Sequence, residues 1–231
     1  MRKTALWRIP CAFFLIACGL NLIGCIRSEA LAAAVKPALL PLLAVTTLAY
    51  LMGRHVRDYR PVALLTAAQL FGCAGDILLI PEGFFFFTGG IAAFLAGHVF
   101  YLYLFGGQSW RGVSLGRWLI ALLVMAGAVF GMVKVIGIEG ALLWPMAVYG
   151  FVLMLLVFST LAGLAANWRD NRATWVVLLL GALLFTFSDS CIAMGIFGVM
   201  KFPLHHFLVM GTYLAAQSLL AIGGIRLIGA R

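Results

Sequence analysis

Long apolar runs, each ended by a short polar or Gly/Pro-rich segment, follow one another along almost the whole chain. An apolar run of about 18 or more residues is long enough for a helix to cross the roughly 30 Å hydrocarbon core of a bilayer. Eight runs meet this criterion: residues 8–26, 33–53, 61–80, 85–105, 115–134, 140–164, 174–197 and 203–228. We therefore predict an all-α, polytopic membrane protein with eight transmembrane helices.

No polar segment between these runs is long enough to fold separately, so we expect a single integral membrane domain over residues 1–231. The chain also shows a weak repeat of four spans, covering 1–106 and 114–231. An even number of spans in each unit predicts parallel repeats around a central cavity, although membrane helices can also align by chance. Three residues recur at offsets of 108 to 113 positions: Pro37 as Pro145, Asp76 as Asp189, and His98 as His206.

Composition agrees with a membrane protein, because 65% of the residues are hydrophobic and 10% are charged, whereas soluble domains are roughly half apolar. If the N-terminus is cytoplasmic, that side collects twelve of the sixteen cations, as the positive-inside rule requires. We expect both termini in the cytoplasm and, from the short loops, a place in the bacterial inner (plasma) membrane. The cations are scattered along loops, which argues against a nucleic-acid partner.

The sequence contains no recognisable metal or cofactor motif. All five cysteines fall within apolar runs, and phosphate loops and dinucleotide glycine fingerprints are absent. His205 and His206 would point about 100° apart on a helix. We therefore expect no metal and no cofactor; a metal held by His98, His206 and the two intramembrane aspartates is the alternative.

Asp76 and Asp189 are the clearest candidates for chemistry, since each interrupts an otherwise apolar run. An ionised carboxylate at the centre of a bilayer costs at least about 2.5 kcal/mol, so such residues usually face the interior of a bundle and serve a function there. Both aspartates fall in the last third of spans that run outward from the cytoplasm. We expect them in the outer half of the bilayer, at one shared site in a cavity that opens toward that leaflet.

Other polar residues share helix faces with these acids or lie on neighbouring spans. On the last span, His206, Tyr213 and Gln217 fall on one face at spacings of seven and four residues, which favours His206 over His205. His98 lies deeper in the fourth span, where an imidazole can titrate or orient a carboxylate. Interhelical hydrogen bonding is the simpler role for His98 and Gln217. Tyr101, near a cytoplasmic end, is expected to be an interfacial anchor.

Five motifs, in order, resemble the YhhN-like membrane proteins, a family that includes the lysoplasmalogenases of bacteria and mammals. The resemblance runs from about residue 30 to the C-terminus; the first span carries no motif, and Ala74 stands where a larger apolar residue is expected. It implies a hydrolase that cleaves the vinyl ether bond of a lysoplasmalogen to a fatty aldehyde and glycerophosphoethanolamine or glycerophosphocholine. The motifs are Lys36-Pro37, Gly75-Asp76-Ile-Leu-Leu, Phe94-Leu-Ala-Gly-His98-Val-Phe-Tyr101, Gly181-Ala-Leu-Leu-Phe-Thr-Phe-Ser188-Asp189-Ser and Tyr213-Leu-Ala-Ala-Gln217.

Vinyl ether hydrolysis needs an acid that protonates a carbon and a carboxylate that stays charged, and two nearby carboxyl groups in a low-dielectric cavity can divide these roles. Our hypothesis makes Asp76 and Asp189 this pair, without deciding which is the acid, and has His98 and His206 relay or tune protons.

The expected partners are a lysophospholipid substrate and membrane lipids, with the oligomeric state open. A proton-coupled transporter of small solutes or lipids is the competing interpretation, because intramembrane acids and histidines serve such proteins too. Five residues are predicted to bind the substrate: Lys36 through its phosphate, Ser188, Tyr213 and Gln217 through water or the glycerol hydroxyls, and Tyr149.

Overall fold

The computed structural model describes residues 6–54, 56, 58–199 and 203–229. Within them, eight helices are long and apolar enough to span a membrane, and each overlaps one predicted span. The all-α prediction is confirmed, and the chain is a multi-pass membrane protein. The helices are α1 (Arg8–Arg27), α2 (Glu29–Met52), α3 (Arg60–Leu78), α4 (Phe84–Ser109), α5 (Leu115–Ile136), α6 (Leu143–Ala166, after the 3-10 turn η2, Gly140–Leu142), α7 (Arg172–Ile196) and α8 (His205–Gly229).

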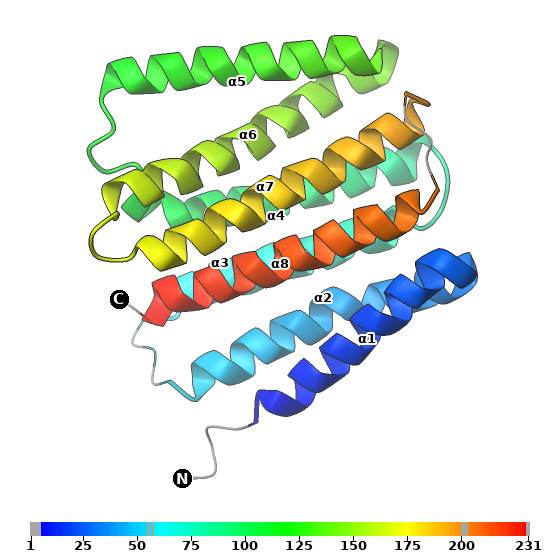
Figure 1. Cartoon of the computed structure of the whole chain (residues 1–231), viewed down its shortest axis with the longest axis horizontal. Coiled ribbons are helices and arrows are strands. Elements are labelled where there is room, and N and C mark those ends of the chain that lie inside the picture. The colour runs from blue at the N-terminus through cyan, green and yellow to red at the C-terminus, as the bar shows by residue number, and fades with distance from the viewer. Residues whose placement is uncertain (1–5, 55, 57, 200–202, 230–231) are drawn as a thin grey trace.

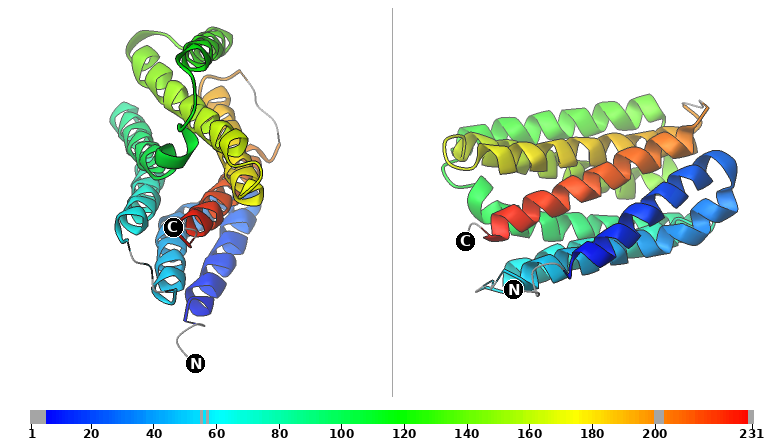
Figure 2. Two further views of the ribbon diagram at one scale, coloured as in Figure 1. Left: turned by 90° about the vertical axis from the view of Figure 1, so that its left-hand side faces the viewer. Right: turned by 60° about the horizontal axis from the view of Figure 1, so that its bottom comes forward.

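The helices run back and forth side by side, and both chain ends lie at the same end of the bundle (Figure 1). α5 forms one edge and α1 the other, with α3, α4, α6, α7 and α8 between them (Figure 2). Eight of the described cations belong to loops and helix ends on the side of the termini; Arg27, Lys36 and Lys134 lie toward the opposite end. Five of the sixteen cations lie outside the described residues: Arg2, Lys3, Arg57, Lys201 and Arg231.

Consecutive helices pack in the same succession in both halves of the chain. α1 packs on α2, α2 on α3 and α3 on α4; likewise α5 packs on α6, α6 on α7 and α7 on α8. Across the halves, α4 packs on α6, while α8 packs on α2 and α3. The four-plus-four repeat and its symmetry axis stay a prediction.

Two prolines interrupt the backbone hydrogen bonds of α2 near the end that carries Lys36. Pro37 and Pro41 both lie inside the helix. Since Pro41 has no N–H to donate to the Pro37 carbonyl four residues earlier, that carbonyl lacks its helical partner. The Cys73 thiol of α3 lies 3.5 Å from it and donates to it instead. The Pro37 carbonyl therefore ties α2 to α3 one turn before Asp76.

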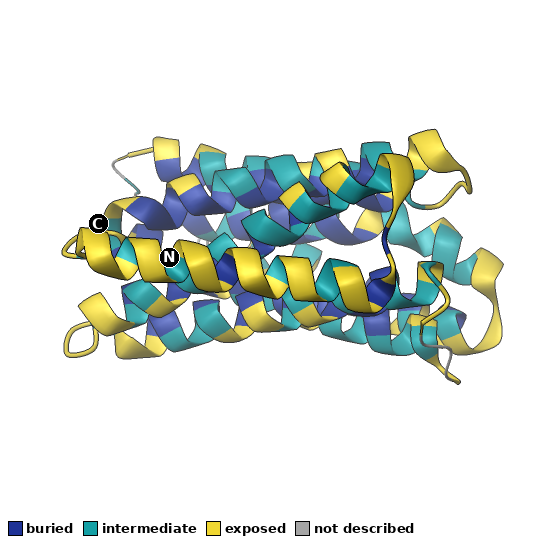
Figure 3. Ribbon diagram, turned by 90° about the horizontal axis from the view of Figure 1, so that it is seen from above, coloured by how far each residue is buried: buried dark blue, intermediate teal, exposed yellow. Residues whose placement is uncertain are grey.

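Burial is concentrated in the middle of the bundle, and the helices at its edge expose apolar side chains as a lipid-facing surface requires. α5 is the extreme case, because only Met125 and Ile136 are buried among its residues; Figure 3, seen from the α5 side, shows this edge.

α6 and α7 approach each other closely where Trp175 packs on Gly163. A Cβ at Gly163 would overlap the Trp175 indole, so this contact requires glycine.

Candidate functional site

Asp76 lies in the last turn of α3, and both of its carboxylate oxygens have donors. Lys36 Nζ on α2 lies 3.5 Å from Asp76 Oδ1. The Tyr213 hydroxyl on α8 donates to Asp76 Oδ2 at 2.8 Å. The carboxylate is 2% exposed and lines neither of the cavities described below. Asp76 therefore joins α2, α3 and α8 at one buried point.

A chain of hydrogen bonds extends from this point to α4. Gln217 Nε2 donates to the Tyr213 oxygen at 3.4 Å, and the Tyr101 hydroxyl donates to Gln217 Oε1 at 3.0 Å. The absence of a side chain at Gly72 makes room, since a Cβ there would come within 3.2 Å of Gln217 Nε2. We refer to Lys36, Asp76, Tyr213, Gln217 and Tyr101 as the buried polar chain.

The predicted role of Tyr101 as an interfacial anchor is wrong. Its side chain is 1% exposed and its hydroxyl faces the bundle interior. The reason is the polar residue on α8 at the same depth: an amide buried in a bundle needs partners, and the Tyr101 hydroxyl provides one to Gln217.

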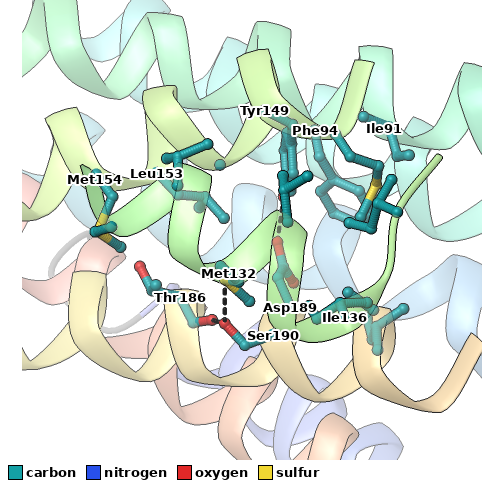
Figure 4. A pocket seen from close by; sticks show the side chains of 18 of the residues that line it. Ile91, Phe94, Met132, Ile136, Tyr149, Leu153, Met154, Thr186, Asp189 and Ser190 are labelled. Carbon is teal, nitrogen blue, oxygen red and sulfur yellow. Dashed lines mark hydrogen bonds between the residues drawn. The ribbon is translucent and has the colours of Figure 1, made fainter. Parts of the chain in front are cut away.

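Asp189 on α7 has a different setting. The Tyr149 hydroxyl on α6 donates to Asp189 Oδ2, and Tyr149 itself is buried. Asp189 is partly exposed and lines a cavity of about 200 Å³ between α4, α5, α6 and α7. Figure 4 shows the carboxyl group of Asp189 beneath Tyr149 at the wall of this cavity.

The lining of this cavity, which we call the apolar cavity, is almost entirely hydrocarbon. Thr186 and Ser190, on either side of Asp189 on α7, add two hydroxyls, and Ser190 donates to the Thr186 carbonyl at 2.7 Å. Such a lining suits an alkyl chain with one reactive group beside the acid. Other members include Ile91, Phe94, Ala128, Met132, Ile136, Leu153 and Met154.

A second, larger cavity of about 1030 Å³ lies at the end of the bundle opposite the termini. We call it the polar cavity, because its lining includes charged and titratable side chains: Glu29, Lys36, Glu82, His205 and His206. Leu79, Phe87 and Ile192 line both cavities, so the two spaces adjoin. An amphiphile with a polar head and an apolar chain can therefore occupy them together.

Phe94 connects the surroundings of the two acids. Its ring packs on Gly75, where a Cβ would come within 2.7 Å of it, and it meets Tyr213 edge-on at 6.0 Å between centroids. The same ring lines the apolar cavity with Asp189. Among the described residues, no hydrogen bond joins Asp76 to Asp189 directly.

His98 is buried next to the partner of Asp189. Its Nδ1 lies 2.6 Å from the Phe94 carbonyl; because a carbonyl only accepts, Nδ1 carries a hydrogen, and in the neutral imidazole Nε2 is then an acceptor. His98 Nε2 has no hydrogen-bond partner among the described residues. The imidazole meets the Tyr149 ring edge-on at 5.8 Å between centroids.

The remaining predicted residues do not converge on the acids. Ser188 is buried and donates to the Val209 carbonyl at 3.0 Å, which ties α7 to α8 and keeps its hydroxyl out of both cavities. His206 is exposed and lines the polar cavity together with His205. Although it shares a face with Tyr213, it lies beyond the buried part of α8.

The structure also identifies residues that the sequence reasoning missed. Thr186 and Ser190 line the apolar cavity. Thr186 lies three residues before Asp189 and so shares its helix face, a spacing that could have suggested it. Ser190, directly after Asp189, carried no such signal. For metal ligands, no three His, Cys, Asp or Glu side chains converge anywhere in the described ranges, so the alternative site that used His98, His206 and both aspartates does not form.

Comparison with known proteins places this arrangement in a family. The model of the YhhN family matches residues 31–224, a range that contains the whole buried polar chain, both aspartates and His98. The chain belongs to the YhhN family. No solved structure matches it.

Curated relatives of this YhhN protein include lysoplasmalogenase TMEM86B of mouse, 33% identical, and of human, 32% identical; each match covers 71% of this chain and 64% of the relative. Human lysoplasmalogenase TMEM86A is 29% identical, with 68% of this chain and 62% of the relative covered. The match thus spans somewhat less than two thirds of the relatives' length.

Proposed function

We propose that this YhhN-family protein is a lysoplasmalogenase-type hydrolase, which cleaves the vinyl ether bond of a lysoplasmalogen to a fatty aldehyde and a glycerophospho head group. The observation that carries the proposal is the position of Asp189. A carboxyl group lies at the wall of an apolar cavity that adjoins a cavity with charged walls. The relatives named lysoplasmalogenase supply the reaction class.

The substrate lies across the two cavities in this proposal. The alkenyl chain occupies the apolar cavity, where each buried methylene contributes about 0.8 kcal/mol. The head group occupies the polar cavity, with its phosphate toward Lys36 and His206 and its amine toward Glu29 or Glu82. The vinyl ether then falls near Leu79 and Ile192, where the cavities meet, within reach of Asp189.

The reaction consumes one water. An acid donates a proton to the β-carbon of the vinyl ether, which gives an oxocarbenium ion, and water adds to the α-carbon while its proton passes to a carboxylate. The resulting hemiacetal loses its hydroxyl proton, the bond from the former α-carbon to the glycerol oxygen breaks, and that oxygen takes up a proton. The products are the aldehyde and the free glycerol hydroxyl. Proton transfer by a positioned group typically contributes about 10² to 10⁴ in rate.

The other site residues support these steps in our proposal. Tyr149 orients Asp189 through its hydrogen bond, and His98 beside it offers a buried acceptor that tunes this pair. Tyr213 and Gln217 orient Asp76, and Ser188 holds α7 against α8. His206 acts at the head group rather than in proton relay, because it is exposed.

We also propose that the protein lies in a bacterial inner membrane with both termini in the cytoplasm, since the cation-rich end of the bundle carries the termini. Both cavities and both acids then belong to the outer half of the bilayer. Lysolipid would enter the polar cavity from that leaflet.

Aldehyde release from lysoplasmenyl-ethanolamine by the purified protein in detergent tests this function. We expect aldehyde from the wild type, none from the saturated lysolipid, and a loss of about 10² or more for Asp76→Asn and Asp189→Asn. Asp170→Asn is the matched control, since Asp170 is exposed between α6 and α7. No aldehyde from folded wild type would contradict the proposal, and gradient-driven solute uptake in vesicles would then favour a transporter.

A further inference from the structure

The two intramembrane aspartates have partners at the same spacing but of different charge. Tyr149 precedes Asp189 by 40 residues, and Lys36 precedes Asp76 by the same number. In each case the partner comes from the helix before, α6 before α7 and α2 before α3. One half of the chain therefore gives its acid an ammonium group, and the other half gives its acid a phenol.

The surroundings of Asp76 are those of an ionised carboxylate. One oxygen faces the Lys36 ammonium and the other accepts from the Tyr213 hydroxyl. A buried charge is tolerated where an opposite charge and hydrogen bonds satisfy it, and both are present. With both oxygens engaged and neither cavity within its reach, Asp76 has no free position for a substrate.

The surroundings of Asp189 are those of a neutral acid. Its Oδ2 accepts from Tyr149, its Oδ1 has no protein donor in the described ranges, and no lysine or arginine of those ranges forms an ion pair with it. The ring next to Tyr149 is His98, whose one N–H is used by the Phe94 carbonyl. An ionised carboxylate with a single neutral donor, at the wall of a hydrocarbon cavity, is strongly unfavourable.

We infer that Asp189 is the protonated acid, with its proton on Oδ1, and that Asp76 is a permanently ionised counter-ion that holds Lys36 and Tyr213 in place. The role in turnover rests on the proposed function: Asp189 gives its proton to the β-carbon of the vinyl ether, and its carboxylate takes a proton from the water that adds to the α-carbon. Asp76 does not touch the substrate and is a positioning residue.

Infrared spectroscopy of the protein without substrate tests the protonation states separately from turnover. The chain has seven carboxylate side chains. The five besides Asp76 and Asp189 are exposed, so the two aspartates are the carboxyl groups inside the bundle. Purified protein in a detergent without ester carbonyls should show one C=O stretch of a protonated carboxylic acid, which shifts in D₂O. Asp189→Asn should remove this band, and Asp76→Asn should leave it.

A second variant tests whether Lys36 keeps Asp76 ionised. Lys36→Met should add a second carboxylic acid band, because Asp76 loses its cation and becomes protonated, and Lys36→Met combined with Asp76→Asn should remove the added band. Lys134→Met, which changes an exposed lysine of α5 at the same end of the bundle, is the matched control and should leave the spectrum unchanged.

Three results would overturn the assignment: no carboxylic acid band in the wild type, a band that disappears in Asp76→Asn but persists in Asp189→Asn, or no new band in folded Lys36→Met. These spectra do not depend on turnover. A protein with the expected bands but no aldehyde release would leave the protonation states standing and refute the proposed function alone.

Discussion

Tyr213 donates its hydroxyl to Asp76 across 137 residues of sequence, with 2.8 Å between the two oxygens. This bond joins the last helix to the third, and Gln217 continues it to Tyr101 on α4. Because hydrogen bonds to charged groups in the interior are worth more than neutral ones, the buried polar chain specifies how α2, α3, α4 and α8 meet.

Removing the Tyr213 hydroxyl should therefore be costly. Tyr213→Phe keeps the ring contacts with Phe94 and Phe185 but deprives Asp76 of one donor, and we expect a loss of about 1.5–3 kcal/mol. Thermal unfolding in detergent measures it. Tyr103→Phe, which alters an exposed tyrosine of α4, should be neutral. Equal melting temperatures for both variants would show that the bond contributes nothing.

The contact between Gly163 and Trp175 should be equally sensitive. Gly163→Ala places a methyl group into the buried indole, and overpacking of this kind costs about 1–3 kcal/mol. The melting temperature should fall, and aldehyde release should fall with it, because the α6–α7 contact positions Tyr149 against Asp189. Gly131→Ala on α5, where nothing lies within 4 Å of the added carbon, should not destabilise the protein. An unchanged Gly163→Ala would mean that α6 and α7 separate freely.

Filling the apolar cavity should change the preference for chain length. Ala128 on α5 lines it, so Ala128→Phe removes space that a long alkenyl chain needs. Each excluded methylene should lower kcat/KM by about fourfold, from a transfer free energy of about 0.8 kcal/mol, while short chains react as before. Ala126→Phe, on the same helix but outside the cavity lining, serves as control. If both variants lost long-chain activity alike, the chain would bind elsewhere.

His206 should affect binding of the head group and not the chemical step. It is exposed and lines the polar cavity, as Lys36 does, and a contact with a charged group at an exposed site is worth about 0.2–1 kcal/mol. His206→Gln should therefore raise KM for lysoplasmenyl-ethanolamine by up to about fivefold with kcat unchanged. A 1-alkenylglycerol without phosphate should show no such change, and His206→Lys should restore binding. A fall in kcat in His206→Gln would instead support the proton-relay role that its place in the sequence suggested.

Much of the fold could be predicted from the sequence, because the thickness of a bilayer dictates the length of an apolar run that spans it. All eight predicted spans overlap observed helices. The interior position of Asp76 followed from the cost of a charge in hydrocarbon, and Asp76 is buried.

What the sequence by itself determined is therefore which segments span the membrane and that the two intramembrane aspartates turn inward. Only the tertiary structure decided which residues meet: Lys36 at Asp76, Tyr149 at Asp189, Tyr101 at Gln217, and Ser188 at a backbone carbonyl. The physical reason is that helical periodicity sets the direction of a side chain about its own axis, whereas its partner depends on which helix packs alongside and at what depth, and contacts between distant segments set both.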